Sequence, residues 1–256
     1  MGPALQSQNT MKSNVVELAS GDTRPLVLEL LAQRQMYIVF QPIVDLQTRQ
    51  IFANEALLRC KSPEFEGPLS ILTSAVQSNC MGELGRKLRE MTINSAPNCP
   101  LFLNVHPNEF DEGWLVRPDD PIFWHEQGVF LEITESVPLS HFQMCHSSLR
   151  EIRSKGVFLA VDDLGAGYSN LKYIADLDPE IVKLDRELIA GLPKDKRQYQ
   201  LVRSIVRLCT EMGARVVVEG IETRDELTSV IDCGAHYGQG FLLARPAYPS
   251  PSVFWP

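Results

Sequence analysis

The stretch Val157-Phe158-Leu159-Ala160-Val161-Asp162-Asp163-Leu164-Gly165 decides the fold of this chain. Five consecutive apolar residues lead directly into two carboxylates, and a glycine follows shortly afterwards. An unbroken apolar run of this length, bounded by polar and turn-forming residues, is typical of a strand that is buried on both faces. Such strands belong to parallel sheets covered by helices. The stretch therefore predicts a parallel sheet with acids at the end of a strand.

The same pattern recurs along the chain. Strands are expected at 37–46, 51–59, 101–103, 129–131, 157–161, 181–182, 216–218 and 241–243, and helices at 26–32, 71–92, 142–155, 170–177, 198–212 and 224–233. About eight strands over this length suit a closed barrel, and the first strand lacks a Gly-rich dinucleotide loop. The polar turn 47–50 predicts a hairpin. We expect an α/β fold, a TIM-like (β/α)8 barrel with one antiparallel strand near the N-terminus.

Composition limits the classes of function. The net charge of −8 and pI of about 5.2 argue against a protein that grips long nucleic acid through its phosphates. No apolar stretch is long enough for a membrane segment, and the six cysteines are scattered without metal-ligand spacing. These features predict free thiols and a cytoplasmic location. Residues 1–25 are polar and are expected to form a flexible leader or linker, with one domain over 26–256.

Polar side chains follow or lie within most of these strands, and one more follows Tyr237-Gly238. They are Glu55, Asn104, Glu132, Asp162, Asp163, Lys183, Glu219 and Gln239. In a barrel the carboxyl ends of parallel strands meet on one face, so these side chains are expected to converge. One polar residue at a strand end commonly just begins a loop, but a series of potential metal ligands is difficult to attribute to loop composition.

A convergent set of carboxylates predicts metal binding. Carboxylates at close quarters cannot all ionise unless cations lie among them. Oxygen ligands with an amide among them, and no set of Cys or His, suit Mg²⁺ or Mn²⁺. Adjacent Asp162 and Asp163 can bridge two such ions, the arrangement used for in-line attack on phosphodiesters. These residues alone indicate a metal-dependent phosphodiesterase.

Motifs along the chain resemble the EAL-domain cyclic di-GMP phosphodiesterases. Glu55-Ala56-Leu57-Leu58-Arg59 is similar to the family signature, and the loop 162–169 resembles its DDFGTGYS motif, with Leu164 and Ala166 in place of the usual Phe and Thr. The other matches, in family order, are Gln41-Pro42-Ile43-Val44, Leu103-Asn104-Val105, Leu131-Glu132-Ile133-Thr134-Glu135, Val182-Lys183-Leu184-Asp185, Glu219-Gly220-Ile221-Glu222-Thr223 and Gln239-Gly240-Phe241. The resemblance covers about residues 26–250.

The resemblance implies hydrolysis of cyclic di-GMP to linear pGpG by two Mg²⁺ or Mn²⁺ ions per site, with inhibition by Ca²⁺. One ion would be held by Glu55, Asn104, Glu132 and Asp162, and the other by Asp162, Asp163 and Glu219. Lys183 would hold or polarise the attacking water, and Glu219 is the candidate general base in one-metal accounts of the mechanism. The substrate contacts would be Gln41, Arg59, Gln239 and Asp185. Glu135 would anchor the loop that follows Asp162 at a homodimer contact.

Several alternatives stay open at this point. A barrel that binds cyclic di-GMP without hydrolysis, as a receptor or scaffold, would normally lack an acidic position, and none is missing here. Another Mg²⁺-dependent barrel, acting on sugar phosphates or enolates, does not predict the loop 162–169. The alternative roles are an ordinary salt bridge to Asp185 for Lys183, a surface ion pair for Arg59, and a helix N-terminal charge for Glu135. An upstream regulatory domain or a partner protein is expected to control activity.

Overall fold

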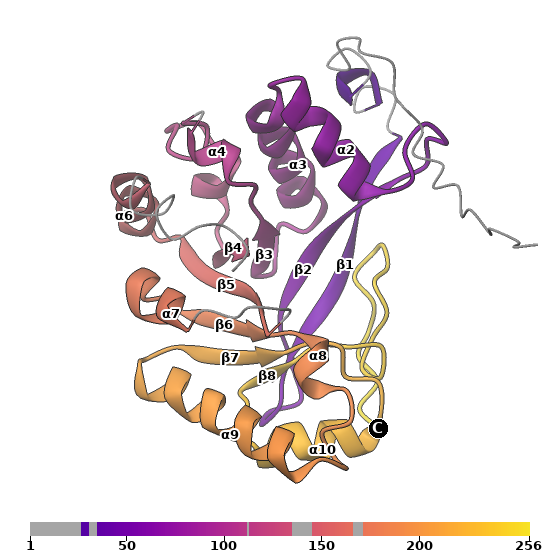
Figure 1. The fold of residues 1–256 in the computed structure, drawn as a ribbon. Coiled ribbons are helices and arrows are strands. Elements are labelled where there is room, and N and C mark those ends of the chain that lie inside the picture. The colour runs from indigo at the N-terminus through magenta and orange to yellow at the C-terminus, as the bar shows by residue number, and fades with distance from the viewer. Residues whose placement is uncertain (1–26, 31–34, 112, 135–144, 166–170) are drawn as a thin grey trace, which may run out of the picture.

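Eight strands close into a barrel in the computed structural model, which describes residues 27–30, 35–111, 113–134, 145–165 and 171–256 (Figure 1). The strands follow one another around the barrel in sequence order. They are β1 (Met36–Asp45), β2 (Ile51–Cys60), β3 (Leu101–Asn104), β4 (Val129–Thr134), β5 (Phe158–Leu164), β6 (Ile181–Leu184), β7 (Arg215–Val218) and β8 (Tyr237–Gly238). The predicted α/β barrel is confirmed.

Strand β1 breaks the parallel pattern. It pairs antiparallel with β2 and, where the barrel closes, antiparallel with β8, whereas the other neighbouring strands pair in parallel. The reversal follows Asp45, whose Oδ1 accepts hydrogen bonds from the N–H groups of Gln47 at 2.9 Å and Thr48 at 2.7 Å. Aspartate favours turns because its side chain can accept such bonds. The predicted hairpin is confirmed.

Helices cover the outside of the barrel, with α2 and α3 on one side and α9 and α10 on the opposite side (Figure 1). Their bounds are α2 Pro68–Gln77, α3 Met81–Ser95, α4 Asn108–Asp111, η1 Pro121–Trp124, α6 His146–Ser154, α7 Lys172–Leu177, α8 Arg186–Ile189, α9 Lys196–Glu211 and α10 Arg224–Asp232. Val202, Val206 and Cys209 of α9 are buried in one cluster with Val216 and Val218 of β7. This spacing of three and four residues places one helical face on the sheet.

One apolar layer closes the inside of the barrel. Each strand contributes one buried residue to it: Ile43, Ala53, Phe102, Phe130, Ala160, Ile181, Val217 and Tyr237. Phe102 and Phe130 stack with ring centroids 4.4 Å apart, and Phe52 stacks on Tyr237 at 4.1 Å. Side chains of a strand alternate between its two faces, so the residue two positions away from each layer residue also points into the barrel.

The expected helix at 71–92 is two helices, and that prediction is wrong. α2 ends at Gln77, and α3 begins at Met81. Between them Asn79 adopts a φ of 51°, in the left-handed region that interrupts a helix. Asparagine tolerates this conformation better than most residues, which is why it often follows a helix end.

The expected strand at 241–243 is also wrong, because the last strand is β8 and residues 241–243 form a turn. The N–H groups of Leu243 and Ala244 both reach back to the carbonyl of Gly240, at 3.1 and 3.0 Å. Gly240 lies directly on the backbone of Ile221, where an added Cβ would come within 2.2 Å of its nitrogen. The chain therefore turns at the glycine. Short helices α4 and η1 lie between β3 and β4, where no helix was expected.

Two further sequence expectations can be compared with the structure. All six cysteines are free thiols, as expected from their scattered positions. Within the part of the chain that the structure describes, no helix has the length and apolar character needed to span a bilayer. The leader 1–25, the start of the expected helix at 142–155 and the loop position Ala166 lie outside the described residues.

Candidate metal centre

A ring of polar side chains stands above the apolar layer of the barrel. It consists of one residue from each strand or from the position directly after it: Gln41, Glu55, Asn104, Glu132, Asp162, Lys183, Glu219 and Gln239. Each of them is two positions from the layer residue of its own strand, so strand alternation turns it into the barrel. In the parallel strands the polar residue lies on the carboxyl side of the layer residue. The structure thus brings these eight residues together.

Lys183 occupies the middle of this ring. Its Nζ lies 2.9 Å from Asp162 Oδ1, 2.7 Å from Glu219 Oε1 and 3.6 Å from Glu55 Oε2. It also forms an ion pair with Glu132. Lys183 and Glu132 are fully buried. Within the described residues its ion pairs are with these carboxylates, so the alternative of a simple salt bridge to Asp185 is not what the structure shows.

The charges of the ring change the pKa values of its members. Burial alone would lower the pKa of Lys183, but attraction to Asp162, Glu132 and Glu219 outweighs it and raises that pKa well above its usual value. Burial raises the pKa of Glu132, and repulsion from Glu55 adds to this against the pull of Lys183. Burial likewise raises the pKa of Glu219 to about 8, although Lys183 opposes the shift. One ammonium therefore cannot keep all of these carboxylates ionised, and further positive charge is needed.

A second carboxylate cluster lies at the edge of the ring. Among the described residues, Asp162, Asp163 and Glu219 each offer an oxygen within 4.8 Å of the others. Asp163 has a φ of 59°, a left-handed conformation that is uncommon outside glycine and turns its side chain back toward Asp162. Burial, followed by repulsion from Asp162, raises the pKa of Asp163 to about 6. Asp162 thus belongs both to the ring around Lys183 and to this cluster.

Buried acceptors of the ring have no donor in the described structure. Glu132 Oε2 and Gln239 Oε1 are buried and accept no hydrogen bond there. A buried acceptor without a partner is costly, so such atoms usually face a bound ion or an ordered water. A hard divalent cation takes oxygen ligands of this kind, and the carboxylate and amide donors of the ring fit Mg²⁺ or Mn²⁺.

Two amides and one carboxylate form a chain of hydrogen bonds on the β1–β8 side of the ring. Gln239 Nε2 donates to Glu55 Oε2 at 2.7 Å and to Gln41 Oε1 at 3.2 Å, and Gln41 Nε2 donates to the carbonyl of Ala244 at 3.1 Å. Gln41 therefore supports Gln239, which in turn orients Glu55. On the other side of Glu55, Asn104 Nδ2 lies 3.4 Å from its Oε1, and the Asn104 side chain is exposed.

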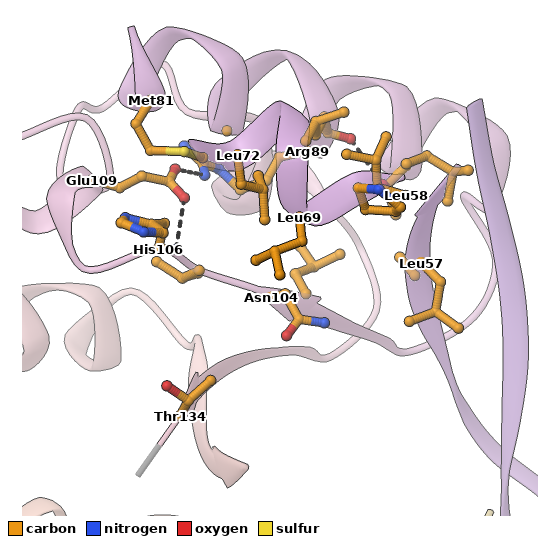
Figure 2. A pocket seen from close by; sticks show the side chains of 18 of the residues that line it. Leu57, Leu58, Leu69, Leu72, Met81, Arg89, Asn104, His106, Glu109 and Thr134 are labelled. Atoms are coloured by element: carbon orange, nitrogen blue, oxygen red, sulfur yellow. Dashed lines mark hydrogen bonds and ion pairs between the residues drawn. The ribbon is translucent and has the colours of Figure 1, made fainter. Parts of the chain in front are cut away.

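A largely apolar cavity of about 510 Å³ adjoins the ring (Figure 2). Its walls come from α2, α3 and the carboxyl ends of β2 and β3, and include Leu58, Leu69 and Leu72. Asn104 and Arg59 lie at its polar edge. Arg59 Nη1 donates to the carbonyl of Leu58 at 2.8 Å, and within the described residues Arg59 has no ion pair. Asn104 is the ring member that lines this cavity.

Asp185 was expected to contact the substrate, but it lies outside the ring. Asp185 begins α8, where its Oδ1 accepts the N–H of Glu187 at 2.7 Å, so the structure places it as a helix cap. Its charge nevertheless contributes to the raised pKa of Asp163. Glu135 lies outside the described residues.

Sequence analysis missed a buried ion cluster beside the cavity. Arg89 of α3 contacts Glu109 of α4 and Asp120, the residue that caps η1, and all three side chains are buried. The signal in the sequence is weak: Asp120 precedes Pro121, a common helix start, and Gly85 leaves room for a neighbour one turn before Arg89.

Comparisons with known proteins agree with this architecture. The family model described as "EAL domain" matches residues 26–246 of this chain. A cyclic di-GMP phosphodiesterase of Pseudomonas aeruginosa is 32% identical over 86% of this chain and 40% of its own length. An uncharacterized protein of Sinorhizobium fredii is 32% identical over 87% of this chain and 28% of its own length. The chain thus spans less than half the length of these curated relatives.

Solved structures show the same fold. Klebsiella pneumoniae BlrP1 was determined with cyclic di-GMP and calcium, and with cyclic di-GMP and manganese. The two structures align with TM-scores of 0.72 and 0.73 and identities of 27% and 26%. Each alignment covers 85% of this chain and 57% of BlrP1. With the barrel, the ring of acids and the match over residues 26–246 all in agreement, the chain belongs to the EAL domain family.

Proposed function

We propose that this chain hydrolyses cyclic di-GMP to linear pGpG with the help of divalent metal ions. The observation that carries the proposal is the ring itself, in which four carboxylates surround one ammonium group and a fifth carboxylate lies at the edge. The four belong to Glu55, Glu132, Asp162 and Glu219, and the fifth belongs to Asp163. Relatives that share the family are named as cyclic di-GMP phosphodiesterases, and BlrP1 was solved with this nucleotide and manganese.

The donor set divides into two overlapping groups. Glu55, Asn104, Glu132 and Asp162 would hold one Mg²⁺ or Mn²⁺ ion, and Asp162, Asp163 and Glu219 would hold a second. Bound ions of this kind supply Lewis acidity at the phosphoryl oxygens and lower the pKa of water. Asp162 would serve both ions. This agrees with its place in both the ring around Lys183 and the second carboxylate cluster.

Lys183 and Glu219 are suited to hold the attacking water and to take up its proton. The Nζ of Lys183 can donate to a water oxygen at the centre of the ring, where its ion pairs keep it charged in spite of its burial. Glu219 is the most exposed of its carboxylate partners, with 18% of its side chain accessible. It can therefore accept a proton from water and release it to solvent, which is the role of a general base.

Arg59 and the adjoining cavity are suited to bind the phosphate and the base of the nucleotide. The planar guanidinium of Arg59 can bind two oxygens of one phosphate, and within the described residues no carboxylate competes for it. The apolar wall formed by Leu58, Leu69 and Leu72 suits a flat nucleobase. Gln41 and Gln239 would contact the nucleotide from the other side of Glu55, and Asp185 would contact it from the start of α8.

The experiment is an assay of pGpG formation by the purified chain with Mn²⁺ or Mg²⁺. Glu55→Ala and Glu219→Ala are each expected to reduce the rate by more than about 100-fold, because each removes an oxygen donor of the centre. Arg207→Ala is the control, since it removes an exposed ion pair with Glu211 on α9 and should leave the rate unchanged. Ca²⁺ in place of Mn²⁺ is expected to inhibit, because its larger shell suits this chemistry poorly.

The same assay separates hydrolysis from the alternatives. If wild type binds cyclic di-GMP but releases no pGpG with either metal, the chain is a receptor or scaffold. If it neither binds nor hydrolyses the nucleotide, the proposed substrate is wrong. Retention of full activity by Glu219→Ala would remove Glu219 from the mechanism.

We further propose that the chain acts in the cytoplasm as a homodimer under the control of an upstream domain or a partner protein. Six free thiols agree with a reducing compartment. Sedimentation of the purified chain checks the dimer: a single species at monomer mass across the working concentrations would contradict it.

A further inference from the structure

The cluster of Arg89, Glu109 and Asp120 ties three segments together beside the ring. Arg89 Nη2 lies 2.7 Å from Asp120 Oδ2, and its Nε donates to both Asp120 oxygens at 3.2 Å. Arg89 Nη1 donates to Glu109. The three side chains are 3%, 1% and 0% exposed. A helix of the outer layer is thereby bound to both short helices that follow β3.

Burial of these charges is not explained by stability alone. Taking two carboxylates and a guanidinium out of water carries a desolvation cost that their attraction can fail to offset. An apolar cluster would hold the same helices together without that cost. Buried ionic groups of this kind are best understood through the geometry that they fix, so the atoms held by Glu109 are the informative ones.

Glu109 holds the backbone that follows the proposed metal ligand Asn104. Its Oε1 accepts the N–H of His106 at 3.1 Å. One residue earlier, the N–H of Val105 donates to the carbonyl of Glu132 at 3.1 Å. The chain is thus pinned at both of the positions directly after Asn104. Figure 2 shows Glu109 between Arg89 and His106, with Asn104 farther along the same segment.

Asn104 depends on this support because little holds its side chain. The side chain is exposed, and its hydrogen bond to Glu55 is long, at 3.4 Å. Its orientation toward the ring must therefore come mainly from its backbone. Groups that fix the orientation of a metal ligand in this way typically change metal affinity by 10- to 100-fold when they are lost.

Helix α3 is shaped to receive the Glu109 carboxylate. A Cβ added to Gly85 would lie 2.0 Å from Glu109 Oε2 and 2.3 Å from its carboxyl carbon. The carboxylate therefore rests on the bare backbone of α3, between Gly85 and Arg89. The ion pair with Arg89 and the close fit against Gly85 together fix the position of the Glu109 carboxylate.

We propose that Glu109, clamped by Arg89, which Asp120 holds in turn, is a positioning residue that aims Asn104 at the metal centre. The proposal rests on the proposed function, since it takes Asn104 as a metal ligand. Glu109 itself is not one of the proposed metal ligands. It acts through the N–H of His106 on the end of β3.

A double-mutant cycle of Mn²⁺ affinity tests this proposal. The dissociation constant of Mn²⁺ is measured by calorimetry for wild type, Glu109→Ala, Asn104→Ala and the double variant, without nucleotide. Glu109→Ala is expected to weaken Mn²⁺ binding about 10-fold in wild type and less than about 2-fold when Asn104 is already alanine. A merely structural role would give the same factor in both backgrounds, and that result overturns the proposal.

Two further variants keep the test decisive. If Glu109→Ala does not fold, Gly85→Ala takes its place in the cycle, because it displaces the Glu109 carboxylate without removing a charge. Arg153→Ala is the matched control: it breaks an ion pair with Glu180, which precedes β6 at the opposite end of the barrel, and should leave Mn²⁺ affinity unchanged. Normal Mn²⁺ binding by wild type without any loss in Glu109→Ala contradicts this proposal only. Absence of Mn²⁺ binding by wild type contradicts the proposed function as well.

Discussion

Lys183 places an ammonium group among carboxylates that would otherwise repel one another. Its Nζ forms ion pairs with Glu55, Glu132, Asp162 and Glu219, and it is fully buried. The lysine therefore has two effects on this centre. It neutralises part of the charge when the protein folds, and it leaves an acidic remainder that divalent ions can neutralise.

Lys183→Met should abolish hydrolysis and lower the free energy of unfolding by about 3 kcal/mol in EDTA, because it leaves buried carboxylates without their counter-charge. Mn²⁺ should restore part of the lost stability by supplying positive charge to the same oxygens. Urea unfolding in EDTA and in Mn²⁺ measures both effects. An equal loss of stability under the two conditions would contradict this view of the centre.

The pKa values of Glu219 and Asp163 predict how metal binding depends on pH. In the metal-free protein they are raised to about 8 and about 6, so the folded state keeps protons that the unfolded state has already released. Stability without metal should therefore fall as pH rises through this window, and Mn²⁺ affinity should rise because fewer protons must be displaced. Calorimetry at pH 6 and pH 8.5 checks the affinity; tighter binding at pH 6 would show that the sign is wrong.

At the scale of single elements, the sequence predicts the strands better than the helices. Most ring residues follow an apolar run, as Glu132 and Lys183 do, and strand alternation then fixes the direction of the side chain. That rule needs no knowledge of distant contacts, so Glu132 or Lys183 can be placed from its own strand. The Arg89–Glu109–Asp120 cluster joins residues that are 20 and 31 positions apart, through short helices that carry no periodic signal.

The interruption between α2 and α3 is a second feature that the sequence pattern does not predict, because it also depends on distant contacts. Apolar spacing continues from Ile71 to Leu88, so periodicity favours one long helix. The break at Asn79 depends on packing of the two helices against β1 and β2, where Ile71, Met81 and Leu84 share a cluster with Met36. Tertiary packing outweighs local propensity there.

Asn79→Ala should lower the free energy of unfolding by about 1 kcal/mol, because alanine is strained at a φ of 51°. Asn79→Gly is the matched control and should be neutral or slightly stabilising, since glycine adopts this conformation without strain. Urea unfolding of both variants measures the difference. If alanine were as stable as glycine, the break between α2 and α3 would not lie at this residue in solution.

At the scale of the whole molecule, an acidic protein encloses an acidic centre. The net charge is −8, and the ring contributes more carboxylates than Lys183 can neutralise. An anionic dinucleotide would meet repulsion there unless cations were bound. The barrel brings the carboxylates together: it closes eight strands, fills one inner layer with apolar side chains and turns the residue two positions from each layer residue into one ring.

The proposed hydrolysis of cyclic di-GMP at this ring requires divalent metal. It is tested by the rate of pGpG formation by wild type, first stripped with EDTA and then titrated with Mn²⁺. We expect no pGpG in EDTA and a rate that rises to saturation as Mn²⁺ is added. A rate that is unchanged in excess EDTA, or no pGpG at saturating Mn²⁺ while the nucleotide is bound, would contradict it.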